Sequence, residues 1–337
     1  MRKADMIIDL QYGSTGKGLI AGYLANEYNY DVVVTANMPN AGHTYIDAYG
    51  VEFIHKVLPN GMASENVHTA MIGPGAVFDI NRLHEELAHL RNNGYAENTT
   101  VYIHENAVVL APKHKDREIT QGDAIGSTNQ GSGAALVEKI MRDPESELLA
   151  RDVMSSDITD KILIVTPQQY REALEDAECL LLEAAQGFSL GISERFYPYC
   201  TSRDCTPARF MADMAIPLPM LNDVIGCARV HPIRVGGTSG GFYDDQEELT
   251  WEQLGKQPEL TTVTKRVRRV FSYSEQQIEE AIMATRPDRV FLNFCNYDSQ
   301  AALEAKAHID MVSAKYGLLG VQYLGWGATH QDVEDNT

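Results

Sequence analysis

The chain has 337 residues, of which 44% are hydrophobic and 22% charged, and its formal net charge is −19. The length fits a globular protein with a large core, and the acidic balance argues against binding of polymeric nucleic acid, which needs a basic surface. No run of about eighteen apolar residues occurs, so we expect no membrane-spanning helix and no membrane partner.

The start of the chain and its cysteines favour the cytoplasm. Residues 1–5 lead directly into an apolar run and lack the long apolar region of a signal peptide. The five cysteines are odd in number and show no metal-ligand spacing, which favours free thiols in a reducing compartment.

Short apolar runs alternate with helical patterns along the chain. The strand-like runs lie at 6–8, 32–35, 70–72, 100–103, 162–165, 180–182, 224–228, 290–292 and 321–324. Helical patterns follow at 81–92, 133–142 and 274–285, and another begins near Leu19. Continuous apolar strands between helices indicate an α/β fold with a large, mainly parallel central sheet. We expect residues 1–337 to form one domain, with a frayed acidic tail at 331–337.

The stretch Asp-Leu-Gln-Tyr-Gly-Ser-Thr-Gly-Lys-Gly at 9–18 joins the first apolar run to a helical pattern. Its glycines let backbone N–H groups approach an oxyanion, the helix start adds partial positive charge, and Lys17 can contact phosphate. The spacing differs from the usual P-loop, because two residues separate Gly13 from Gly16 and Gly18 follows the lysine. Alone, the pattern favours phosphate binding only slightly over a tight turn with a solvated lysine.

A second stretch, Asn-Ala-Gly-His-Thr at 40–44, sharpens this interpretation. Together the two stretches resemble adenylosuccinate synthetase, whose loops read Gln-Trp-Gly-Asp-Glu-Gly-Lys-Gly and Asn-Ala-Gly-His-Thr. The second loop matches fully, and the first departs at Tyr12, Ser14 and Thr15. The resemblance extends over residues 6–327 and implies the P-loop-like nucleotide-binding architecture of that family.

The resemblance implies a ligase that joins L-aspartate to C6 of a purine nucleotide, through a 6-phosphoryl intermediate and with Mg²⁺. The implied catalytic residues are Ser14, Lys17, His43 and Gln186, with His43 as the acid on the leaving side. Ser14 and the Gly42 carbonyl take the metal-binding positions. The implied donor-nucleotide site comprises Gly13, Thr15, Gly16, Lys17, Gly18, Gly42, His43, Thr44, Asn293, Asn296, Gly325 and Gly327.

Later segments resemble the parts of the family that hold the substrate nucleotide. Residues 125–133 are similar to its Ile-Gly-Thr-Thr-Gly-Arg-Gly-Ile-Gly loop, with Gln130 in place of the arginine. Residues 183–187 and 197–202 resemble its Glu-Gly-Ala-Gln-Gly and Tyr-Pro-Tyr-Val-Thr-Ser segments. The implied substrate contacts are Asn40, Ser127, Thr128, Arg142, Gln186, Thr201, Arg234 and Arg268. Arg142 matches an arginine that reaches across a dimer interface, so we expect a homodimer.

The one basic cluster, Lys-Arg-Val-Arg-Arg at 265–269, stands out on this acidic chain. A solvated helix start is one interpretation, but three preceding threonines favour an anion-binding loop. The segment looks like the family's Thr-Val-Thr-Gly-Arg-Pro-Arg-Arg loop. That resemblance implies that Thr264 and Arg266 bind the aspartate substrate, and a guanidinium fork suits a carboxylate well.

Two departures from the family bear on specificity. Ser14 stands where the family has an aspartate that contacts the purine edge, so a guanine 2-amino group meets neither its bulk nor its charge. Asn296 stands where the family's carboxylate reads guanine in the donor, and an amide both donates and accepts hydrogen bonds. These departures predict dGMP as substrate and ATP or dATP as donor. They resemble the family's phage-encoded branch, the 2-aminoadenylosuccinate synthetases of diaminopurine DNA, which would work in the host cytoplasm.

Two other interpretations stay open at this point. One is an ordinary adenylosuccinate synthetase that uses IMP, aspartate and GTP. The other, from a different functional class, is an inactive nucleotide-binding regulator. We favour an active enzyme because Lys17, His43, Gln186 and Arg266 are all retained.

Overall fold

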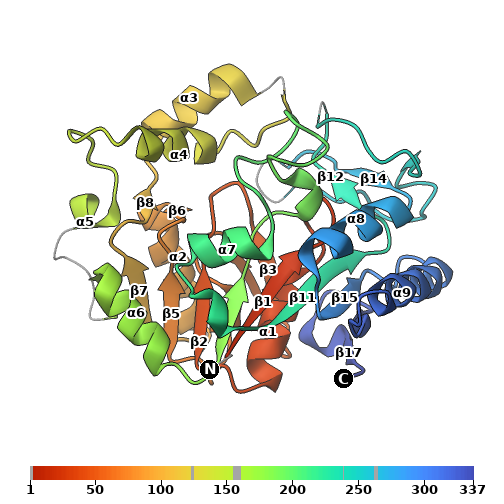
Figure 1. Ribbon diagram of the computed structural model, residues 1–337, viewed down its shortest axis with the longest axis horizontal. Coiled ribbons are helices and arrows are strands. Elements are labelled where there is room, and N and C mark those ends of the chain that lie inside the picture. The colour runs from red at the N-terminus through yellow and green to blue at the C-terminus, as the bar shows by residue number, and fades with distance from the viewer. Residues whose placement is uncertain (1–2, 123–124, 155–160, 238, 262–264) are drawn as a thin grey trace.

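The computed structural model describes residues 3–122, 125–154, 161–237, 239–261 and 265–337 (Figure 1). A ten-stranded sheet forms its centre, in the order β17-β16-β15-β11-β1-β10-β2-β5-β7-β9. All neighbouring strands in it are parallel except β16 and β17. The strands are β1 (Ala4–Asp9), β2 (Val32–Thr35), β5 (Thr69–Ile72), β7 (Thr100–His104), β9 (Ile162–Val165), β10 (Leu180–Glu183), β11 (Leu221–Arg229), β15 (Arg289–Asn293), β16 (Val321–Gly325) and β17 (Val333–Asp335).

This sheet confirms the predicted α/β fold, and its strands other than β17 coincide with the continuous apolar runs. Strands at the middle of the sheet are buried along almost their whole length, as expected when both faces are covered. Their side chains and those of α1 (Lys17–Glu27) belong to one large apolar core. None of the helices in the described part of the chain combines the length and apolar character that crossing a membrane requires.

Side-chain caps fix where several helices begin. The carboxylate of Asp79 accepts hydrogen bonds from the first turn of α2, and the hydroxyl of Ser274 does so for α8. Asp298 caps α9 in the same way. The helices after α1 are α2 (Ile80–Asn92), α3 (Pro112–Gly122), α4 (Ser132–Met141), α5 (Ala150–Val153), α6 (Pro167–Asp176), α7 (Pro207–Asp213), α8 (Glu275–Thr285) and α9 (Ser299–Ala314).

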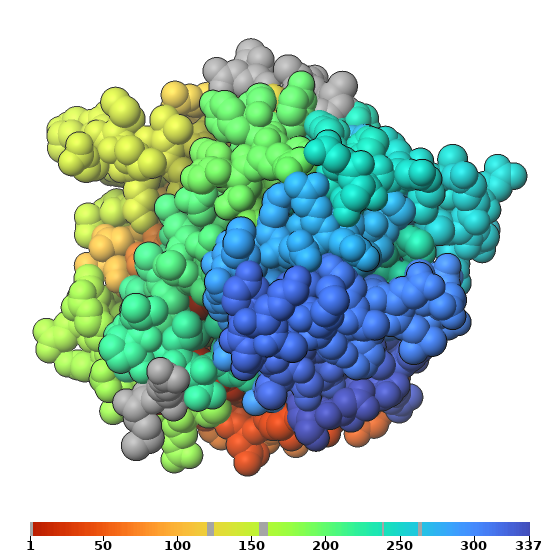
Figure 2. All heavy atoms as spheres, turned by 45° about the vertical axis from the view of Figure 1, so that its right-hand side comes forward, coloured from red at the N-terminus to blue at the C-terminus, as the bar shows by residue number. Residues whose placement is uncertain are grey.

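Smaller elements surround the sheet. They are β3 (His43–Ile46) with β4 (Glu52–His55), β6 (Val77–Phe78) with β8 (Val108–Val109), the sheet of β12 (Ile233–Arg234), β14 (Arg269–Phe271) and β13 (Glu248–Leu249), and the short 3-10 helices η1 (Asn60–Met62), η3 (Phe188–Leu190), η4 (Leu218–Met220) and η5 (His330–Asp332). Figure 2 shows the last third of the chain, in blue, as one continuous surface on its side of the molecule.

The prediction of a frayed tail at 331–337 was wrong. The tail forms η5 and β17, and β17 pairs with the edge strand β16, where it satisfies backbone groups that would otherwise be open. The Tyr28 hydroxyl donates to Asp335 (2.9 Å), and the Trp326 indole donates to Glu334 (2.8 Å). The first contact joins the tail to a segment far away in the sequence and the second to the adjacent β16 segment, and the acidity of the tail gave no sign of either.

Candidate active site

The predicted phosphate and nucleotide residues gather at the carboxyl ends of neighbouring strands. The segments that follow β1, β2, β10, β11 and β15 all leave the same edge of the sheet, because these strands are parallel and lie near one another in it. This edge is where open α/β sheets bind ligands.

Asp9, at the end of β1, organises the loop of residues 11–17. Its carboxylate accepts hydrogen bonds from the backbone N–H groups of Gln11 (2.9 Å) and Gly13 (3.1 Å). It also accepts from the Thr15 hydroxyl (2.6 Å) and pairs with Lys17 Nζ (2.8 Å), and all of these side chains are buried. A phosphoryl group that binds Lys17 would therefore compete with Asp9. Asp9 was absent from the predicted site, because in the sequence it reads as the last residue of a strand.

Glycines allow this loop to pack against its surroundings. Gly16 has a φ of 97°, and a Cβ there would lie 2.1 Å from Asn293 Nδ2. A Cβ at Gly18 would lie 2.7 Å from the Thr44 carbonyl oxygen, and one at Gly187 would lie 2.3 Å from the Gly13 nitrogen. All three distances are too short for a side chain, so these positions favour glycine. The loop is thereby brought against the predicted residues Thr44, Asn293 and, next to Gly187, Gln186.

His43 and Glu183 form a buried pair beside this loop. His43 Nδ1 lies 2.5 Å from Glu183 Oε1, and the other carboxylate oxygen accepts a hydrogen bond from the Asn60 N–H (2.6 Å). A carboxylate at Nδ1 favours the tautomer with its proton there and fixes the orientation of the ring. The half-buried Gly42 directly precedes His43. Glu183 was missed as a site residue, although it begins the segment that carries Gln186.

Ser14 lies at the tip of the loop and contacts the basic cluster. Its φ is 56°, its side chain is exposed, and Arg268 Nη1 donates to its Oγ (2.5 Å). The Ser14 carbonyl accepts a hydrogen bond from Arg229 (3.2 Å). The structure thus brings two predicted residues, Ser14 and Arg268, into direct contact.

The basic cluster belongs to a two-stranded ribbon at 259–261 and 265–268, which we call the arginine ribbon. Leu260 and Val267 form a β-bridge, and the N–H of Arg268 donates to the Glu259 carbonyl (2.9 Å). The interpretation of a helix start was therefore wrong, because the segment pairs with a partner strand. Arg266 is exposed on the ribbon, and Thr264 lies outside the described residues.

The residues predicted for the substrate nucleotide lie in several places. Asn40 Nδ2 donates to the Thr201 hydroxyl (3.4 Å), so these two meet. Ser127 and Thr128 are half-buried before α4. Arg142 is exposed at the end of α4, which Figure 1 shows beside α3 and away from β15.

Arg234 is buried and engaged within the protein. It donates to the Tyr199 carbonyl (2.9 Å) and lies 4.9 Å from the centre of the Tyr12 ring. Burial lowers the pKa of Arg234 to about 10. In the structure this side chain supports the 197–202 segment.

Three residues predicted for the donor nucleotide, Thr15, Gly16 and Gly325, lie against Asn293. Its side chain donates to the Thr15 carbonyl (3.2 Å), and a Cβ at Gly325 would lie 2.1 Å from its Oδ1. Asn296 is exposed, and its carbonyl accepts a hydrogen bond from Lys256 Nζ (3.0 Å). Gly327 packs against the carboxylate of Asp332.

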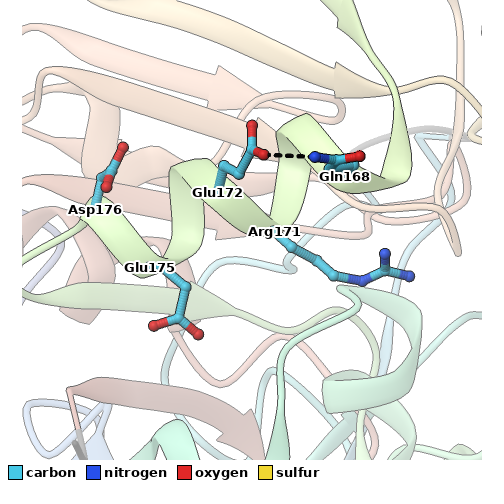
Figure 3. A pocket seen from close by; sticks show the side chains of 5 residues that line it. All are labelled: Gln168, Arg171, Glu172, Glu175 and Asp176. Atoms are coloured by element: carbon cyan, nitrogen blue, oxygen red, sulfur yellow. Dashed lines mark hydrogen bonds between the residues drawn. The ribbon is translucent and has the colours of Figure 1, made fainter.

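Two open hollows lie on the protein surface, one away from this site and one beside it. One, of about 410 Å³, lies along α6 and is lined by side chains of that helix alone (Figure 3): Gln168, Arg171, Glu172, Glu175 and Asp176. It contains none of the predicted residues. The other, of about 540 Å³, adjoins the site, because its lining includes Tyr199 and Arg269, next to the arginine ribbon.

The described residues contain no group of three His, Cys, Asp or Glu side chains that would hold a metal ion unaided. The candidate ligands at Ser14 and Gly42 are a hydroxyl and a carbonyl oxygen. Such neutral, hard oxygen donors suit Mg²⁺, which usually takes few protein ligands and keeps several waters.

Comparison with known proteins agrees with this geometry. The model of the family described as adenylosuccinate synthetase matches residues 6–163 and 145–300. The N6-succino-2-amino-2'-deoxyadenylate synthase of Vibrio phage phiVC8 is 56% identical, over 99% of this chain and 98% of its own. The adenylosuccinate synthetase of Thermococcus onnurineus is 30% identical over 79% of this chain and 76% of its own.

Solved structures show the same likeness. Cyanophage S-2L succinoaminodeoxyadenylate synthetase, bound to dGMP and to dATP as an energy donor, superposes with a TM-score of 0.90 at 35% identity, covering 100% of this chain and 96% of that one. Plasmodium falciparum adenylosuccinate synthetase shares the fold, with a TM-score of 0.78 at 19% identity over 99% of both chains. The chain belongs to the adenylosuccinate synthetase family.

Proposed function

We propose that this protein joins L-aspartate to C6 of dGMP, with ATP or dATP as phosphoryl donor, and yields N6-succino-2-amino-2'-deoxyadenylate. The observation that carries the proposal is the neutral Ser14 at the tip of the loop, hydrogen-bonded to Arg268 (2.5 Å). A carboxylate there would crowd the 2-amino group of guanine. The names of the phiVC8 and S-2L relatives, and the dGMP and dATP bound to the latter, support the same substrate and donor class.

The reaction has two bond exchanges. First, the γ-phosphoryl group moves from the donor to O6 of the purine as N1 loses its proton, to a water held by Ser14 or to the transferring phosphate itself. This converts a poor leaving group into a good one. Then the aspartate amine forms the C6–N bond as the C6–O bond breaks and phosphate leaves. We assign Lys17 to stabilise the moving phosphoryl group, and the loop N–H groups to bind its oxygens.

We assign His43 as the proton donor on the leaving side, held by Glu183 at 2.5 Å. Gln186 would contact the purine near O6. Arg266 and Thr264 would bind the carboxylates of aspartate, and Asn40, Ser127, Thr128, Thr201, Arg234 and Arg268 the substrate nucleotide. Mg²⁺, held by the Gly42 carbonyl, Ser14 and donor phosphate oxygens, would supply charge neutralisation during transfer.

The proposed assembly is a homodimer with composite sites. Arg142 is exposed at the end of α4, and the same helix exposes Val137 (49%), Ile140 (70%) and Met141 (72%). An apolar face beside an arginine suits a self-complementary contact that delivers Arg142 to the neighbour's substrate phosphate. We place the enzyme in the cytoplasm of a phage's host, because the phiVC8 and S-2L relatives are phage proteins and the described cysteines are free.

Phosphate release across a matrix of substrates tests this function. Each of dGMP, GMP and IMP is incubated with aspartate and each of ATP, dATP and GTP, and aspartate is omitted in the controls. We expect release with dGMP and an adenine donor, weaker release with GMP and little with IMP. Efficient use of IMP with GTP would favour an ordinary adenylosuccinate synthetase, and no release with any pair would favour an inactive regulator.

A further inference from the structure

Arg229, at the end of β11, is a fully buried cation that the functions assigned above do not use. Its side chain is 0% exposed. A buried charge is unfavourable unless it is paired and hydrogen-bonded. Arg229 Nη2 lies 2.6 Å from Glu259 Oε1, and Nη1 donates to the Ser14 carbonyl (3.2 Å) and to Glu259 Oε2 (3.3 Å). One guanidinium therefore joins the loop of residues 11–17 to the arginine ribbon.

The backbone of Arg229 is also fixed to that loop. Its N–H donates to Gln11 Oε1 (2.9 Å), and Gln11 Nε2 donates back to its carbonyl (3.1 Å). Both residues are buried. The end of β11 and the start of the loop are thus held by reciprocal hydrogen bonds.

The segment that follows β15 contacts the same pair. The Arg229 guanidinium lies 3.7 Å from the centre of the Phe294 ring, a cation–π contact. The Tyr297 hydroxyl donates to Glu259 Oε1 (2.9 Å). Asn296, proposed to read the donor base, lies between these two aromatic residues in the chain. The Arg229–Glu259 pair therefore fixes both sides of the donor-base segment.

Glu259 connects the pair to the cations of the ribbon. Its carbonyl accepts the hydrogen bond from the N–H of Arg268, one step from the Leu260–Val267 bridge. Burial acts to raise the pKa of Glu259, but the charge and hydrogen bonds of Arg229 outweigh it and hold that pKa below its ordinary value. Glu259 is thus ionised at neutral pH and anchors the ribbon that carries Arg266.

We propose that Arg229 and Glu259 are positioning residues that couple the donor-nucleotide site to the aspartate site. The inference rests on the proposed function for the identity of the two ligands. A donor base that orders residues 294–297 also fixes Glu259, and Glu259 fixes the ribbon that presents Arg266 to aspartate. Bound donor then raises the affinity for aspartate, and by reciprocity aspartate raises the affinity for the donor.

A matched control lies on the same two strands. Arg289 Nε pairs with Asp223 Oδ2 (2.7 Å), which joins the amino ends of β15 and β11 just as Arg229 joins their carboxyl ends to the loops. Asp223→Asn therefore breaks an ion pair between the same strands at the opposite edge of the sheet. Glu259→Gln is the test variant. Arg229→Lys is a second one, since a lysine keeps the charge but loses the bidentate fork.

The measurement is the dissociation constant of L-aspartate by calorimetry, with dGMP present, with and without a non-hydrolysable ATP analogue. We expect the analogue to tighten aspartate binding at least about fivefold in the wild type, the lower end of typical coupling. The ratio of the aspartate dissociation constant without the analogue to that with it falls towards one in Glu259→Gln or Arg229→Lys. The aspartate KM rises about tenfold in these variants, the effect of losing one charge-assisted contact. Asp223→Asn keeps the wild-type ratio even where its Tm falls.

A wild-type ratio of one, an unchanged ratio in both test variants, or an equal loss in Asp223→Asn would overturn the coupling. These outcomes are separable from failure of the proposed function. Turnover of IMP with GTP would contradict the proposed function. The coupling could still be tested in that case, because the same ratio of dissociation constants would be measured with IMP and a GTP analogue.

Discussion

The two charged regions at the carboxyl edge of the sheet are built in opposite ways. In the phosphate centre, which we define as Asp9, Lys17, His43 and Glu183, the charged groups are buried and paired within the protein. On the arginine ribbon, Arg266 is exposed and Arg268 contacts the neutral Ser14. In the proposed mechanism, the first region is preorganised for charge that develops during reaction, and the second presents cations to incoming anions. Changes in the two regions should therefore affect different kinetic constants.

The largest expected effect lies in the phosphate centre. Lys17→Ala or His43→Ala should lower kcat by about 10²–10⁴-fold, the range for one positioned electrostatic donor or proton-transfer group, with smaller changes in the Michaelis constants. Steady-state kinetics with dGMP, aspartate and ATP measure this. Glu183→Gln, which keeps the shape of the partner, should lower kcat less than His43→Ala. If these variants changed the Michaelis constants and left kcat intact, the centre would bind ligands without taking part in transfer.

Ser14→Asp joins the two regions by placing a new carboxylate beside Arg268. It should lower kcat/KM for dGMP by about 10²-fold or more, because a charged side chain beside C2 disfavours the 2-amino group. Activity with IMP should fall much less or rise. Competition between dGMP and IMP under one donor measures the change in preference.

Ser14→Ala is the matched control for that substitution. It removes the hydrogen bond from Arg268 but adds neither bulk nor charge, so the preference for dGMP should persist. An enzyme whose wild type prefers IMP over dGMP would contradict the role given to Ser14.

Arg266→Leu tests the ribbon alone. Loss of one charge-assisted contact should weaken aspartate binding by roughly 1.5–3 kcal/mol, which raises the aspartate KM about 10–100-fold. The Michaelis constants for dGMP and ATP should change little. Arg269→Leu, at the start of β14 directly after the ribbon and paired with Glu248, controls for loss of any nearby cation. Unchanged aspartate kinetics in Arg266→Leu would refute the assignment.

The same contrast explains which features were predictable from sequence. Continuous apolar runs such as Leu180–Glu183 predicted strands, because burial on both faces leaves a local signal. The glycine and histidine motifs predicted two loops that the structure places together at the carboxyl edge of the sheet. Asp9, Glu183 and Arg229 gave no such signal, because each looks like the end of a strand. Their partners, near in the chain for Asp9 and distant for Glu183 and Arg229, meet them only in the fold. The pairing of β17 with β16 was hidden because the acidic tail has no apolar strand pattern.

The smallest expected effect is on the choice of donor, at Asn296. An aspartate accepts hydrogen bonds from two guanine N–H groups but repels the adenine edge, which has an acceptor at N1, whereas an amide tolerates both. Asn296 is exposed, and its backbone carbonyl accepts a hydrogen bond from Lys256 Nζ (3.0 Å), so a change of the side chain leaves that contact intact.

Asn296→Asp should therefore move the GTP-to-ATP preference by about tenfold, equal to about 1.4 kcal/mol, with kcat for the better donor nearly intact. Asn296→Ala, which removes the amide without adding charge, should weaken the binding of both donors. The ratio of kcat/KM for GTP and ATP should stay closer to the wild-type value. The ratio of kcat/KM for the two donors is the measurement. The expected change in donor preference is small, because Lys256 and solvent offset part of the negative charge that the aspartate adds to this exposed segment. Charges in the buried phosphate centre are not screened in this way. Strict dependence of the wild type on GTP would be incompatible with this assignment. It would indicate that Asn293, and not Asn296, recognises the donor base.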